Sequence, residues 1–129
     1  ADYFDAPVQV ELVTVGIDSP QGSPYDNTLD VANLTGVSDD AKFLLLYITM
    51  RSSATQGGRA GIKQPGDTNY KWLIGAYNEI PGNSEPAAHQ LTGGISGQMW
   101  FPVVGGGLDY RAESTGNSTF ELSVLAEIV

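Results

Sequence analysis

The chain of 129 residues has the length of one domain, and its composition excludes several kinds of site. It contains no cysteine, which excludes disulfides, zinc–thiolate sites, iron–sulfur clusters and thiol nucleophiles. Fifteen acidic and six scattered basic residues give a net charge of −9, so neither nucleic acid nor an anionic membrane is an expected partner.

The first predicted strand is VQVELVTVGI at residues 8–17, which begins with alternating apolar and polar residues. Before it, a proline sets off residues 1–7 as an N-terminal arm, which is either free or reaches a neighbouring molecule. In the arm, the candidate contacts with a partner are Tyr3, Phe4, Asp5 and Pro7.

The apolar run FLLLYITM at residues 43–50 is predicted to be a strand. Eight residues are few for a helix, and Phe, Tyr, Ile and Thr favour extended backbone. The run is apolar in both phases, so we expect one face in the core and the other covered by a loop, the arm or another subunit. The phase that holds Leu44, Leu46 and Ile48 is the candidate subunit interface.

The remaining strands follow at short intervals between Gly- and Pro-containing turns. They are expected at residues 28–34, 59–64, 69–77, 89–94, 96–104, 108–113 and 118–129. This spacing predicts an all-β fold, an antiparallel β-sandwich or jelly roll of about eight strands, which forms a single domain over residues 8–129.

No catalytic, cofactor-binding or metal-binding residue is predicted. His89 is the only histidine, and GGISGQ at residues 93–98 lacks the second glycine of a nucleophile elbow. The GGG at residues 105–107 is expected to form a turn. A loop Ca²⁺ site drawn from Asp18, Asp26, Asn27 and Asp30 stays open as an alternative, although no EF-hand spacing is present.

Aromatic residues are the remaining candidates for binding. Half of the strand positions of a sandwich face inward, which favours core positions for Trp72 and Trp100. Tyr77 lies in the opposite phase to Trp72 and is a candidate for the surface. If they are exposed, Tyr77 and Trp100 form a candidate ligand-stacking surface.

The segment TGVSDDAKFLLLYITMRSS, a Gly turn, the short strand RAGIKQPGD and a Trp/Tyr strand follow one another over residues 35–77. This arrangement resembles the compact β-sandwich modules of tailed-phage virion proteins, both capsid decoration proteins and head- or tail-fibre domains. The resemblance implies a non-enzymatic decoration (cement) protein that binds the outer capsid surface. It also implies self-association, with a trimer favoured, and a location in the virion.

Two other functions stay open at this point. One is a carbohydrate- or receptor-binding jelly roll of a fibre or lectin, and the other is a small polysaccharide-degrading enzyme, which needs two converging carboxylates. No basic, apolar and then small-residue leader opens the chain, so we expect synthesis in the host cytoplasm.

Overall fold

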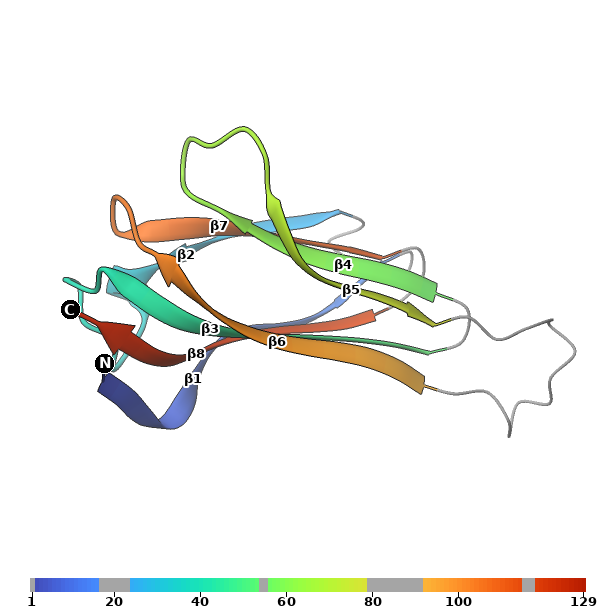
Figure 1. The fold of residues 1–129 in the computed structure, drawn as a ribbon, viewed down its shortest axis with the longest axis horizontal. Coiled ribbons are helices and arrows are strands. Elements are labelled where there is room, and N and C mark those ends of the chain that lie inside the picture. Colours follow the sequence, from blue (N-terminus) through green and yellow to red (C-terminus); the bar gives the residue numbers. More distant parts are fainter. Residues whose placement is uncertain (1, 17–23, 54–55, 79–91, 115–117) are drawn as a thin grey trace, which may run out of the picture.

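A computed structural model describes residues 2–16, 24–53, 56–78, 92–114 and 118–129. These residues form eight strands and one 3-10 turn, and every strand pairing is antiparallel. The predicted all-β antiparallel sandwich is therefore confirmed (Figure 1). The strands are β1 (Asp2–Val15), β2 (Tyr25–Asp30), β3 (Phe43–Ser53), β4 (Gln56–Lys63), β5 (Lys71–Asn78), β6 (Thr92–Pro102), β7 (Gly107–Ser114) and β8 (Ser118–Ile128).

The strands are divided between two four-stranded sheets. Sheet A has the order β1-β8-β3-β6, and sheet B has the order β2-β7-β4-β5. The pairs β1–β8, β2–β7, β3–β6 and β4–β5 are nested like the two arms of one long hairpin. Successive pairs fall alternately into sheet A and sheet B, and this arrangement is the jelly roll.

The core lies between the inner faces of the two sheets. The rings of Tyr110 on β7 and Phe120 on β8 stack across it, with centroids 5.9 Å apart. Because both sheets supply apolar side chains at alternate positions, the core is continuous along the sandwich. Its buried strand residues include Val15, Leu44, Leu46, Ile48, Met50, Phe101, Leu122 and Val124 from sheet A, and Leu29, Ala60, Ile62, Leu108 and Ala112 from sheet B.

The position of β3 corrects the predicted subunit interface. Leu44, Leu46 and Ile48 belong to the core cluster and are almost fully shielded from water within a single chain. This phase of the strand faces sheet B, so it is not a surface that another subunit could contact. Leu45, in the opposite phase, is also only 6% exposed.

The predicted arm and three of the predicted strands also differ from the structure. Residues 2–7 are part of β1 and are not a free arm. The strand expected at 28–34 ends at Asp30, whose carboxylate accepts a hydrogen bond from the Ala32 N–H and so caps the turn at Val31–Asn33. The strands expected at 89–94 and 96–104 are one strand, β6, as far as the described residues show.

The GGG segment forms the turn that the sequence predicts. Val104 and Gly107 are bridged, and between them Gly105 and Gly106 have φ angles of 67° and 80°. Two central residues with positive φ are typical of the tight hairpin turn that favours glycine. Gly107 is glycine for a different reason: a Cβ at this position would lie 2.6 Å from the Leu29 carbonyl oxygen.

Truncation of a core residue of β3 tests this placement. We expect Leu46→Ala to lower the free energy of unfolding by about 2–5 kcal/mol, because it leaves a cavity between the sheets. Leu12→Ala, at a position 57% exposed on β1, should change it by less than about 0.5 kcal/mol. Urea denaturation followed by circular dichroism measures both values, and equal losses would contradict the assignment.

Candidate interaction surfaces

A row of four side chains crosses the outer face of sheet A. Tyr3 pairs with Ala126, Ala126 with Leu45, and Leu45 with Trp100, so the row has one residue on each strand. The rings at its two ends meet edge to face, with Tyr3 and Trp100 centroids 6.5 Å apart and planes at 80°. Directly opposite residues share one face of a sheet. The two rings therefore cover Ala126 and Leu45, which explains why Leu45 is buried on an outer face.

Large apolar side chains are exposed at the end of the sandwich where Tyr3 begins this row. We call them the end patch, and they are Tyr3, Phe43, Ile128 and Val129. Phe43 lies directly opposite Ile128, and Tyr3 is 68% exposed. The start of β1 lies beside the end of β8 here, since Asp2 pairs with Glu127 (Figure 1). Clustered exposed apolar residues indicate an interaction surface more strongly than isolated ones.

The edge of sheet A is irregular beside the end patch. The β1–β8 ladder contains the pair Tyr3–Ala126 and resumes at Val8–Val124, so residues 4–7 oppose only Leu125. Asp5 and Pro7 are exposed, whereas Phe4 is half-buried and packs against the core. The structure thus places three of the four predicted arm contacts, Tyr3, Asp5 and Pro7, on the surface, and it turns Phe4 inward.

The surroundings of the end patch are acidic. Asp2 and Asp5 are exposed on β1, and Asp39 and Asp40 are exposed in the loop that precedes β3. This loop lies at the same end, because the Ser38 N–H donates to the Glu127 carboxylate at 2.8 Å. Lys42, which directly precedes β3, is an exposed basic residue. The end patch therefore combines apolar side chains with a negatively charged rim.

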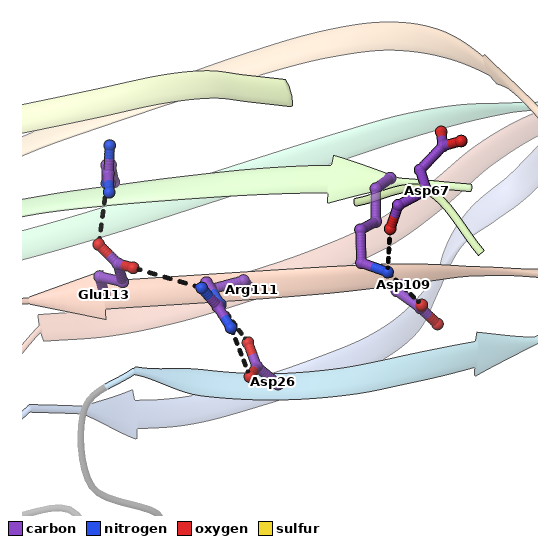
Figure 2. A network of polar contacts seen from close by, with 7 residues as sticks. Asp26, Asp67, Asp109, Arg111 and Glu113 are labelled. Atoms are coloured by element: carbon purple, nitrogen blue, oxygen red, sulfur yellow. Dashed lines mark hydrogen bonds and ion pairs between the residues drawn. The ribbon is translucent and has the colours of Figure 1, made fainter. Parts of the chain in front are cut away.

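The outer face of sheet B, in contrast, carries both signs of charge (Figure 2). Arg111 on β7 donates to Asp26 on β2, with one bond of 2.9 Å, and lies 3.9 Å from Glu113. Glu113 also accepts from Arg59 on β4 at 2.8 Å. Because these side chains are partly exposed, each pair contributes only about 0–1 kcal/mol, and the network chiefly aligns β2, β7 and β4.

Tyr70 lies beside this network, just before β5. Its ring centroid is 4.7 Å from the Arg111 guanidinium carbon and 5.3 Å from Lys63 Nζ. Lys63 also donates to Asp109 at 3.1 Å and to the Asp67 carbonyl at 2.9 Å, which ties the β4–β5 loop to the sheet. The ring is thus held by two cations, each of which has an acidic or carbonyl partner of its own.

A cluster of hydrogen bonds around Glu11 joins the two sheets. Glu11 on β1 accepts hydrogen bonds at one carboxylate oxygen from the hydroxyls of Tyr25 and Tyr110 and from the Asn27 amide, the last two at 2.9 and 3.2 Å. Burial, and then the bond to Glu11, raise the pKa of Tyr110, and the same causes raise the pKa of Tyr25. The alternation of residues 8–12 placed Glu11 with the polar positions, and the irregular ladder between Gln9 and Glu11 turns it inward.

Among the residues that the structure describes, those considered for catalysis or metal binding do not converge. Asp26 is paired with Arg111, and Asp30 caps a turn. Within the described ranges, no three His, Cys, Asp or Glu residues lie close enough to hold a metal ion. His89, Asp18 and the side chains of Tyr77 and Trp72 lie outside the described part of the chain. Trp100 is half-buried, in contact with Tyr3.

Comparisons with known proteins add no relative to this description. No model of a protein family matches the chain, and no curated protein matches it. Within the residues that the structure describes, no helix is long and apolar enough to span a membrane.

The Glu11 cluster leads to a prediction about alkaline pH. In the unfolded chain the Tyr110 hydroxyl loses its proton near pH 10, the ordinary pKa of tyrosine. In the folded protein its pKa is higher, so it keeps the proton as the pH rises past 10.0. Unfolding then releases a proton, so stability that is complete below pH 10 falls as the pH rises further. We expect this fall to be shallower in Tyr110→Phe, which at pH 7 should be about 1–3 kcal/mol less stable because it lacks the bond to Glu11.

Urea denaturation at pH 7, 10 and 11 measures both effects. Tyr47→Phe, at a half-buried position on the outer face of sheet A, is the matched control and should follow the unaltered protein. Parallel pH curves for the unaltered protein and Tyr110→Phe would contradict the assignment.

Proposed function

We propose that the protein is a non-enzymatic structural component of a virion, a capsid decoration protein that attaches to the outer capsid surface through its end patch. The observation that carries the proposal is the gathering of exposed Tyr3, Phe43, Ile128 and Val129 at one end of a strongly acidic domain. The jelly roll supports it, because viral capsid domains use this architecture. Since one architecture serves many functions, the proposal rests mainly on the surface.

The acidic rim of the end patch bears on the choice of partner. If two copies packed patch to patch, Asp2, Asp5, Asp39 and Asp40 of each would face the same acids of the other. Juxtaposed like charges oppose association. A partner surface with Lys or Arg around an apolar centre would complement the patch, so a different protein, such as the capsid shell, fits better than a second end patch.

The size of the end patch indicates how the attachment would work. Stable interfaces bury about 800 Å² on each partner, which is more than a few side chains supply. The exposed residues Asp5, Ala6 and Pro7 lie beside the patch and extend the available surface. Repeated sites on one shell, occupied by linked copies of a homo-oligomer, would add avidity to a modest single contact.

A carbohydrate- or receptor-binding module is the second candidate. The observation in its favour is the ring of Tyr70 beside the polar outer face of sheet B, since aromatic rings flanked by polar groups suit sugar binding. The charged groups next to this ring already pair with one another, so a sugar would have to displace those contacts. Binding on a glycan array that Tyr70→Ala abolishes would favour this candidate.

Copurification with a large particle tests the first proposal. We expect the protein to sediment with virus-sized particles in a fixed ratio to their main protein. The double variant Tyr3→Ser/Phe43→Ser should lose at least tenfold in particle occupancy, because it removes two of the four apolar side chains of the end patch. Leu12→Ser, an equally apolar and exposed position elsewhere on β1, is the control and should stay bound.

Two outcomes would overturn the proposal. One is the absence of the protein from particles isolated from the cells that produce it. The other is full particle occupancy by the double variant, provided that circular dichroism shows it to be folded.

A further inference from the structure

We infer that the leading segment of β1, Asp2–Phe4, exchanges between copies of the chain, so that one copy receives this segment from another in place of its own. The result is a strand-exchanged homo-oligomer. This inference concerns self-association, and it does not depend on the proposed role in a virion.

The pairing of β1 with β8 has two separate parts. In the first, Asp2 pairs with Glu127 and Tyr3 with Ala126, and the second part begins at Val8–Val124. A usual β-bulge inserts one extra residue into a ladder. Here residues 4–7 oppose the single residue Leu125, so β1 has three extra residues at this point. The leading segment is thus joined to the rest of β1 by a link that adds no ladder pair.

The composition of this link suits a hinge. Asp5, Ala6 and Pro7 are exposed, and Pro7 has no N–H with which to join a ladder. Three extended residues span about 10 Å, which is about twice the spacing of neighbouring strands. The link is therefore long enough to carry the leading segment from its own β8 to that of an adjacent copy.

The surface on which the leading segment packs is formed by strands β8, β3 and β6. Tyr3 lies over Ala126 on β8 and Leu45 on β3 and meets Trp100 on β6. Phe4 packs inward against the core from the other side of the strand. Tyr3 and Phe4 thus hold the segment on both faces of sheet A. None of these contacts depends on the link, so a second copy's Tyr3 and Phe4 would make the same contacts.

Exchange requires no new chemistry, since the same residues pair and pack whether the segment comes from its own chain or from another copy. Its equilibrium is set by protein concentration, by the freedom of the link and by repulsion between two copies of charge −9. Salt screens this repulsion, so the exchanged fraction should rise with ionic strength as well as with concentration.

The absence of cysteine allows a direct test with the full chain. In the double variant Asp2→Cys/Glu127→Cys, the two thiols lie on paired residues and can form a disulfide. Equilibration at increasing concentration and 0.5 M salt, followed by oxidation, should give disulfide-linked dimers or rings. In the matched control Thr14→Cys/Thr119→Cys, a pair in the second part of the ladder, the disulfide should stay within one chain. Non-reducing electrophoresis separates the products.

A second measurement uses the chain without introduced cysteines. The unaltered chain should show a mass that rises with concentration in light scattering after gel filtration. Deletion of residues 2–4 should keep it monomeric at the same concentrations, because it leaves no segment to exchange, and Leu12→Ser should not. This measurement also covers the case in which loss of the Glu127 carboxylate, which holds the Ser38 N–H, impairs folding of the cysteine variant.

Three results would overturn the inference. The first is a 2–127 disulfide that stays within one chain at every concentration, in a folded variant. The second is an unaltered chain that remains monomeric at about 1 mM. The third is an oligomer that persists when residues 2–4 are deleted. Particle binding plays no part in these measurements, so they are independent of the test of the proposed function.

Discussion

Strand β3 has to be shielded from water on both faces, and much of the surface chemistry follows from the way this is achieved. Sheet B covers the phase that contains Leu44, Leu46 and Ile48. No layer covers the other phase within the described residues, so the cover for Leu45 comes from sheet A itself, through the rings of Tyr3 and Trp100 that meet above it. Since Tyr3 belongs to an edge strand two positions away from β3, the edge of the sheet is coupled to the shielding of its centre.

The same constraint separates the two outer faces by their chemistry. In sheet A the rings of Tyr3 and Trp100 cover Leu45, and Tyr3 remains exposed at the end where β1 leaves the ladder. Sheet B has charges of both signs on its outer face, where Asp26, Arg111, Glu113 and Arg59 satisfy one another across three strands. A face whose charges are paired with one another offers few groups for a partner to contact. An apolar end with an acidic rim offers both apolar area and negative charge. This difference favours attachment through the end of sheet A.

The sequence predicted the fold class because turn residues and alternating strands are local signals, as the GGG turn and the strand at 43–50 show. It did not predict which face of β3 is internal, because both phases are apolar and only the packing of sheet B distinguishes them. It also missed the inward Glu11, whose direction depends on an irregularity in the pairing with β8. The pairing of residues 2 and 3 was hidden for a similar reason, since Pro7 indicated a boundary and the partners lie more than 100 residues away.

The nested strand order also affects when the end of sheet A can form during synthesis and folding. β8 lies inside sheet A, between β1 and β3, although it comes after all the other described strands along the chain. Among the described strands, β1 pairs with β8 alone, so until β8 has left the ribosome this ladder cannot form and Ala126 is not in place beneath Tyr3. Pairing of such distant segments is slow, because closing a long loop precedes any gain from contact. The end of sheet A would therefore form late in folding, and a nascent chain could not engage a partner through it prematurely.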